Sequence, residues 1–229
     1  MITSNAINRT FRLKHGKNIG TCFTIDVAAR QYIVTARHVV ADLLSGEVAV
    51  VEILHDREWK LLPVTVAWLS EQPADVAILA PQQQLSHRDV TLEPTAGGIA
   101  IGQQVYFLGF TELEVLAPPG GAGFPMPLVR QGVLAGIMVQ DDTMVLVIDG
   151  HNIPGFSGGP VVFKPQGSRD YRVAGVVSAY RPQPKPVLRA GQETEYYIAE
   201  NSGLVVAYSL KAGIEHISAN PTGVEIRAD

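Results

Sequence analysis

The sequence predicts an all-β protein, built as a sandwich or a barrel. Short segments rich in apolar and β-branched residues dominate the 229-residue chain, and turn residues separate them at short intervals. The chain holds 22 glycines and 15 prolines, which suits a fold of many short strands, and helical patterns are scarce. A polar stretch at 81–94 divides the predicted strands into two sets.

Each of the two sets has its own series of predicted strands. Those of the first set are 20–27, 31–35, 47–54, 61–69 and 76–80, with a short helical turn at 39–44. Those of the second set are 104–110, 128–139, 144–149, 159–163, 172–179 and 203–209, and a final helix is expected around 210–218. Two segments rich in proline, glycine or polar residues, 118–127 and 181–200, are predicted as long loops that either connect strands or cover a groove.

The composition excludes several functional classes. Hydrophobic residues make up 46% and charged residues 17%, as in a globular domain with a sizeable core. The formal net charge of -4 and the lack of a long Lys/Arg run argue against nucleic-acid binding. No signal peptide and no membrane-spanning apolar run is seen. The single cysteine, Cys22, cannot form an intrachain disulfide, so we expect a cytoplasmic protein.

A glycine-rich turn around one serine is the most informative motif. It reads Pro154-Gly-Phe-Ser-Gly-Gly-Pro160 and opens an apolar strand. Glycines allow tight backbone geometry with positive φ. Such a turn can expose the Ser157 hydroxyl and aim the N–H groups of Gly155 and Ser157 at one point, as an oxyanion hole requires. An ordinary turn between strands would look similar, so the motif needs support from elsewhere.

Two upstream segments supply that support. His38 follows an apolar strand, and Asp75 stands at the mouth of another. Taken singly, such a histidine is more often a surface or core residue, and such an aspartate is usually a turn residue. Together with Ser157 they provide a hydroxyl, a base and an orienting carboxylate, the three groups of Ser/His/Asp nucleophilic catalysis.

The chain resembles the chymotrypsin-fold (trypsin-like) serine proteases, and among them the HtrA/Deg branch. The resemblance covers about residues 10–217 and is carried by 19–25, 33–39, 75–79 and 148–160. It implies two six-stranded antiparallel Greek-key barrels with a short C-terminal helix. The implied division is a protease domain at 10–218, with an N-terminal barrel at 10–85, a C-terminal barrel at 95–210 and a helix at 210–218, then a tail at 219–229. No PDZ domain is expected, because only this tail follows the second barrel.

By resemblance, Ser157 is the nucleophile, His38 the general base and Asp75 the orienting acid, while the N–H groups of Gly155 and Ser157 form the oxyanion hole. The implied activity is that of a serine endopeptidase acting through an acyl-enzyme, without a cofactor. No metal is expected either, because the other histidines show no metal-ligand spacing. The expected partner is a protein or peptide substrate, with no nucleic acid and no membrane. The oligomeric state, including membership of a multi-protein system, is left open.

The predicted substrate preference depends on a few residues around the expected binding cleft. Trypsin carries an acid six residues before the nucleophile, whereas this chain has His151, so a preference for Lys or Arg is not expected. An extended substrate should pair with the backbone at Val177 to Tyr180, where Ala179 and Tyr180 suggest a small or partly blocked apolar pocket. We therefore expect cleavage after small or medium apolar residues. The predicted substrate-binding residues are His151, Val177, Ser178, Ala179 and Tyr180.

Phe156 departs from the family pattern, which has Asp in digestive enzymes and usually Asn in HtrA-type enzymes. Phenylalanine cannot pair with a freed N-terminus, so no activating cleavage is expected, but the resting order of the oxyanion loop comes into question. The main alternative is a non-catalytic or conditionally active peptide-binding module on the same fold. An α/β-hydrolase is a third option, because residues 155–159 fit G-x-S-x-G, but that fold needs the order Ser, acid, His and alternating helices.

Overall fold

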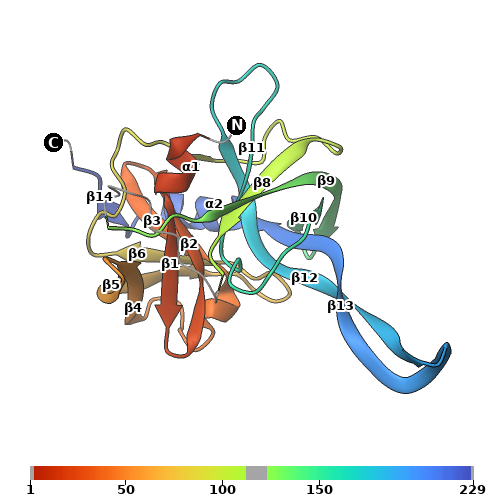
Figure 1. The fold of residues 1–229 in the computed structure, drawn as a ribbon. Helices are drawn as coiled ribbons and strands as arrows, with labels where there is room; N and C mark the ends of the chain where they lie inside the picture. Colours follow the sequence, from red (N-terminus) through yellow and green to blue (C-terminus); the bar gives the residue numbers. More distant parts are fainter. Residues whose placement is uncertain (1–2, 112–122, 228–229) are drawn as a thin grey trace.

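The computed structural model describes residues 3–111 and 123–227. It confirms a mostly β architecture in which two closed sheets stand side by side (Figure 1). The predicted C-terminal helix is present as α2 (Lys211–Ala219), and a short helix α1 (Ser4–Asn8) begins the described chain. Within the described ranges, neither helix is long and apolar enough to cross a membrane.

The first sheet closes into a six-stranded antiparallel barrel in the order β3-β2-β1-β4-β5-β6, because β3 also pairs with β6. Its strands are β1 (Thr10–His15), β2 (Asn18–Val27), β3 (Arg30–Thr35), β4 (Val48–His55), β5 (Glu58–Leu69) and β6 (Ala77–Pro81). Strand β1 was missed by the sequence prediction, although its residues alternate: Phe11 and Leu13 point into the core between polar neighbours.

The second sheet forms a ring in the order β11-β8-β9-β10-β13-β12, closed by pairing of β11 with β12. Its strands are β8 (Gln104–Gly109), β9 (Leu128–Gln140), β10 (Thr143–Asp149), β11 (Pro160–Phe163), β12 (Arg172–Arg189) and β13 (Gln192–Ser209). A short strand β7 (Glu93–Pro94) adds in parallel to β12. Together with the first barrel, this arrangement is a chymotrypsin-like fold.

One hydrophobic cluster joins the two barrels. It includes Phe23 and Ile78 from the first barrel and Leu108 and Val176 from the second, all buried, and Ile217 of α2 completes it. Because these side chains interdigitate at core density, the barrels are held against each other, and residues at their junction keep defined positions.

The chain contacts the first barrel again at two later points, before β9 and after α2. Strand β14 (Val224–Glu225), within the segment predicted as a tail, pairs with β3, and Arg30 forms an ion pair with Glu225 at 2.8 Å. Of the predicted loop at 118–127, residues up to 122 lie outside the described ranges. Phe124 packs edge-to-face on Phe11, with ring centroids 4.9 Å apart, so the end of this segment contacts the first barrel.

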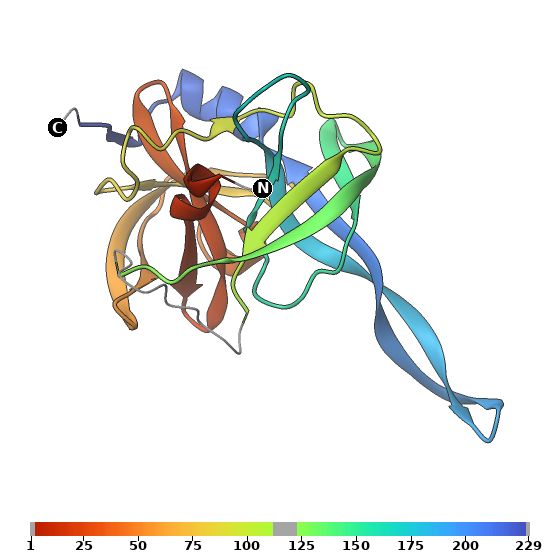
Figure 2. The same cartoon turned by 45° about the horizontal axis from the view of Figure 1, so that its top comes forward.

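The prediction of a long loop at 181–200 was wrong. Strands β12 and β13 each run for 18 residues and form a long hairpin, whose tip stands away from both barrels (Figure 2). The turn is Ala190-Gly191, with φ of 51° and 79°, as in a tight two-residue hairpin. We call residues 181–200 the ribbon. The prolines suggested a loop, but the β-forming residues around Tyr196 to Ile198 pair across the strands instead.

The prolines occupy the free edge of the ribbon. Pro184 faces Ala199 and Pro186 faces Tyr197 in the β12–β13 ladder. Since proline has no N–H, the ladder can continue here only if Lys185, between them, makes the hydrogen bonds to β13. The prolines therefore turn their donor-less side to the outer edge of β12, which is where proline is tolerated in sheets.

Removal of the ribbon tip should leave the barrels intact, because the tip packs on neither of them. We expect deletion of residues 184–199, with Gln183 and Glu200 joined by an Asn-Gly turn, to change the free energy of unfolding by no more than about 1 kcal/mol. Urea denaturation of both proteins measures this. A loss above about 3 kcal/mol, the size of a core mutation, would contradict an independent ribbon.

Candidate active site

The three predicted catalytic residues come from separate elements at the junction of the barrels. His38 lies in a single 3₁₀ turn (Arg37–Val40) directly after β3, and Asp75 lies just before β6. Strands β3 and β6 pair with each other, with Thr35 opposite Ala77, which brings the two residues together. Ser157 lies in the loop between β10 and β11 of the second barrel.

The Asp75 carboxylate holds His38 through two hydrogen bonds. Asp75 Oδ2 lies 2.7 Å from His38 Nδ1, and Oδ1 accepts the His38 backbone N–H at 2.8 Å. An ionised carboxylate only accepts hydrogen bonds, so the pair assigns the proton to Nδ1 and leaves the lone pair on Nε2. The imidazole is half exposed, at 51%, whereas the Asp75 side chain is only 17% exposed.

Both groups have shifted proton affinities. Burial alone would raise the pKa of Asp75, but hydrogen bonds from His38 and Ser178 outweigh it and hold the pKa below its ordinary value. The hydrogen bond to Asp75 raises the pKa of His38 above its ordinary value, against the opposing effect of burial. An ionised acid beside a base of increased basicity is the combination needed for proton abstraction from a hydroxyl.

Ser178 connects this pair to Ser157. Its hydroxyl donates to Asp75 Oδ2 at 2.5 Å, and its carbonyl accepts the Ser157 hydroxyl at 2.9 Å. Among the described residues, no hydrogen bond joins Ser157 to the His38 ring. The structure thus brings His38 and Asp75 into direct contact and links Ser157 to them through Ser178. The sequence analysis named Ser178 for its backbone; its hydroxyl contact was missed, although a serine inside an apolar strand was a usable signal.

The glycines around Ser157 are required by close backbone contacts. Gly155 and Gly158 have φ of 96° and 88°. A Cβ on Gly155 would lie 2.2 Å from the carbonyl oxygen of Phe110, and one on Gly159 would lie 1.9 Å from that of Leu108. Within the described chain, the N–H groups of Gly155 and Ser157 have no acceptor, so both remain available to a ligand.

Phe156 anchors this loop in the core of the second barrel. Its side chain is fully buried, and its ring meets Phe107 edge-to-face with centroids 5.9 Å apart. Gly109 leaves room for it, since a Cβ there would lie 2.6 Å from the Phe156 ring. The Arg130 guanidinium stands 6.0 Å from the ring centroid. Apolar packing in the barrel core therefore fixes the residue that precedes Ser157.

The predicted substrate-binding residues have different environments. His151 is exposed, and its carbonyl accepts a hydrogen bond from Arg130. Ala179 is also exposed, and Tyr180 continues β12. The expectation for Val177 needs correction: its N–H donates to Gly159 O at 2.8 Å and its carbonyl accepts the Gly158 N–H at 2.7 Å. With both backbone groups engaged by the nucleophile loop, any pairing with substrate must begin beyond Val177.

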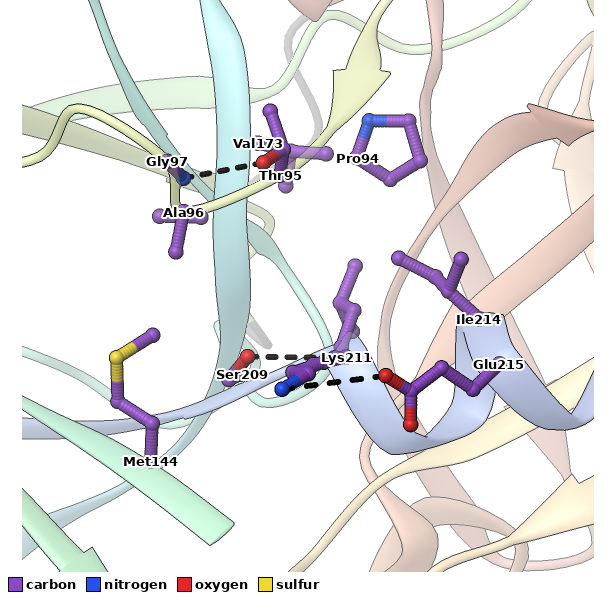
Figure 3. A pocket seen from close by; sticks show the side chains of 12 residues that line it. Pro94, Thr95, Ala96, Gly97, Met144, Val173, Ser209, Lys211, Ile214 and Glu215 are labelled. Carbon is purple, nitrogen blue, oxygen red and sulfur yellow. Dashed lines mark hydrogen bonds and ion pairs between the residues drawn. The ribbon is translucent and has the colours of Figure 1, made fainter.

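Other candidate sites carry less chemistry. A cavity of about 390 Å³ lies between β7, β10 and the start of α2 (Figure 3); it is largely apolar and includes none of the three predicted catalytic residues. Cys22 is fully buried, and burial raises the pKa of its thiol, so it is a poor nucleophile. Across residues 3–111 and 123–227, no three His, Cys, Asp or Glu side chains cluster closely enough to hold a metal ion.

Comparison with known proteins bears on the family and the fold of this chain. The family model of the trypsin-like peptidase domain matches residues 20–169, which include His38, Asp75 and Ser157. No curated protein matches the chain significantly.

Solved structures of proteases share the fold. The active form of the Rv3671c protease from M. tuberculosis has a TM-score of 0.57 at 17% identity, covering 98% of this chain and 88% of that one. Deg5 has a TM-score of 0.59 at 14% identity, covering 96% and 93%. The HtrA-type protease AlgW, solved with a tripeptide, has a TM-score of 0.58 at 16% identity, covering 96% and 64%. Identities this low establish the likeness of fold alone.

Replacement of Phe156 should be costly for stability. Phe156→Ala removes a fully buried ring, so we expect the free energy of unfolding to fall by about 3–5 kcal/mol, with a smaller loss for Phe156→Leu. Denaturant titration followed by tryptophan fluorescence measures both values. Equal stability of the alanine variant and the wild type would show that the ring does not anchor the loop.

Proposed function

Because the chain belongs to the family of trypsin-like peptidase domains, we propose that it is a serine endopeptidase in which Ser157, His38 and Asp75 carry out the reaction. The observation that carries the proposal is the pair of Asp75 hydrogen bonds to His38, at 2.7 and 2.8 Å. They orient the imidazole with Nε2 unprotonated, which is the state required of a general base.

The proposed reaction uses these groups in sequence. His38 Nε2 takes the proton of the Ser157 hydroxyl as the oxygen attacks the scissile carbonyl, and the carbonyl electrons move onto its oxygen. The free N–H groups of Gly155 and Ser157 stabilise that oxyanion. His38 then gives its proton to the leaving amine, and the acyl-enzyme forms. Water, activated by the same imidazole, hydrolyses the ester and restores Ser157.

Ser157 must change its hydrogen-bond partner before it reacts. At rest its hydroxyl donates to the Ser178 carbonyl, 2.9 Å away. A substrate that adds as an extended strand along β12 beyond Val177 would donate a backbone N–H to this same carbonyl. Such competition would release the hydroxyl toward His38. Substrate binding and activation of the nucleophile are therefore coupled through one acceptor.

The proposed substrates are proteins or peptides cleaved after small or medium apolar residues. The solved AlgW structure contains a tripeptide, which supports peptide binding as a property of that relative. In this chain, the exposed Ala179 offers little bulk, and His151 brings no fixed negative charge that would favour Lys or Arg. A cytoplasmic location is part of the proposal and is supported by the single, buried cysteine.

A non-catalytic or conditionally active peptide-binding module is the second candidate. The observation in its favour is the resting hydrogen bond of Ser157, which goes to Ser178 and not to His38. In such a protein, the same open stretch of β12 would capture a peptide without cleaving it. Chemical reactivity of Ser157 separates the two functions.

Reaction with a fluorophosphonate probe tests the catalytic proposal. We expect one adduct per wild-type chain by intact mass, because the probe needs both an activated Ser157 and the oxyanion donors. Ser157→Ala should give no adduct, and Asp75→Asn should react more slowly by orders of magnitude.

Two results would argue against catalysis. An adduct of equal yield on Ser157→Ala would place the reactive group elsewhere. No adduct on the folded wild type, with or without a bound peptide, would favour the binding module.

The pH dependence of kcat/KM should report His38. Catalysis needs the neutral imidazole, and the pKa of His38 is raised, so kcat/KM should fall tenfold per pH unit below a midpoint above about 6.5. Asp75, whose pKa is lowered, stays ionised through this range and adds no second limb. The profile should be measured with a peptide ester or amide between pH 5 and 9. A midpoint below 6 would contradict the His38–Asp75 assignment.

A further inference from the structure

We propose that the side-chain hydroxyl of Thr21 is a positioning group that holds the oxyanion loop in its working shape. Thr21 lies on β2 in the first barrel, whereas the loop belongs to the second. The proposal rests on the serine protease function proposed above and adds a residue outside the predicted catalytic set.

Thr21 makes three contacts with the second barrel. Its N–H donates to Ser157 O at 2.8 Å, and its hydroxyl donates to Gly155 O at 2.7 Å. The same hydroxyl accepts the N–H of Phe110 at 3.1 Å. Thr21 is fully buried, so water cannot replace these bonds when the hydroxyl is lost. One side chain thus ties the loop to the end of β8.

The Gly155 carbonyl depends on this side chain more than its neighbours do. The carbonyl of Phe156 accepts the Gly159 N–H at 2.9 Å, and that of Ser157 accepts the Thr21 N–H, so both are held by backbone groups. Because a peptide unit is planar, the bond on the Phe156 carbonyl also directs the Ser157 N–H. The Gly155 carbonyl is instead held by a hydroxyl, which a single substitution can remove.

The peptide between Gly155 and Phe156 determines how the two oxyanion donors point relative to each other. It lies between the peptide that carries the Gly155 N–H and the peptide that carries the Ser157 N–H. The N–H group of this peptide, that of Phe156, makes only a long hydrogen bond in the described chain, 3.3 Å to Ile153 O. Without the Thr21 hydroxyl this plane can rotate, and a glycine with φ of 96° offers little resistance. The donors would then no longer converge on one oxygen.

Thr21 also stands close to the element that carries the base. The Thr35 hydroxyl donates to Thr21 O at 2.8 Å, and His38 follows Thr35 by three residues. The short stretch of β2 and β3 around Thr21 therefore sets the position of the oxyanion loop relative to the imidazole. Misplacement by about 1 Å in such a site can cost about 100-fold in rate.

Three variants test the proposal. Thr21→Val has nearly the same shape and lacks the hydroxyl, whereas Thr21→Ser keeps it. Thr24→Val is the matched control, because Thr24 is also buried on β2. Its hydroxyl lies 2.6 Å from that of Ser86. Residues 21 and 24 point to opposite faces of the strand, so Thr24 does not contact the loop that Thr21 holds. The measurements are kcat and KM for a peptide substrate, the rate of fluorophosphonate labelling, and the free energy of unfolding.

The expected result separates positioning from stability. Thr21→Val should lower kcat and the labelling rate by about 100-fold with little change in KM, since the loss concerns the oxyanion and not substrate binding. Thr21→Ser should stay within about threefold of the wild type. Thr24→Val should lose stability and keep kcat. A Val variant with wild-type kcat, or a Ser variant as slow as the Val variant, would overturn the proposal.

The outcomes can be told apart even if Thr21→Val does not fold or if the wild type has no protease activity. Should Thr21→Val not fold, Thr21→Ser is compared with Thr21→Cys, which has nearly the same shape but a weak donor. The Cys variant should then be at least about tenfold slower, and equal rates would overturn the proposal. An active wild type with a fully active Val variant refutes the Thr21 role alone. An inert wild type refutes the protease function and this role with it.

Discussion

The contact between strand β2 and the loop at 155–159 is the interaction on which the rest of the site depends. The loop crosses so close to the other barrel that a Cβ on Gly158 would lie 2.0 Å from the Thr21 carbonyl. Only glycine permits this approach, and the approach is what brings Ser157 of one barrel to His38 of the other. The shared hydrophobic cluster packs the two barrels against each other behind this contact.

The fold class and the candidate catalytic residues could be predicted from the sequence because the patterns that indicate them are local. Glycines beside a serine, a histidine after an apolar strand and an acid before another strand can each be read within a few residues. The ribbon was not accessible, because its prolines carry a strong loop signal, and the pairing that overrides it joins residues far apart in the chain. The role of Thr21 could not be predicted either. It lies in a segment that carries the family resemblance, but a threonine in a strand is ordinary until its partners are known.

Phe156 illustrates how a different kind of force can serve the same loop. An ion pair at this position would depend on ionisation and on a correctly placed partner. A buried ring packed on Phe107 depends on neither, and its contribution changes little with pH or salt. The order of the loop is therefore linked to the folding of the second barrel. The ionisable groups of the site are then His38 and Asp75, and Phe156 adds no charge.

The prolines of the ribbon also limit how the protein can associate. A projecting hairpin with exposed Tyr196, Tyr197 and Ile198 has the exposed strand edges that can template pairing with another chain. Here the outer edge of β12 lacks donors at Pro184 and Pro186, whereas the outer edge of β13 keeps all of its N–H groups. Backbone pairing with a further strand is therefore disfavoured along the outer edge of β12 near these prolines and remains open along the outer edge of β13.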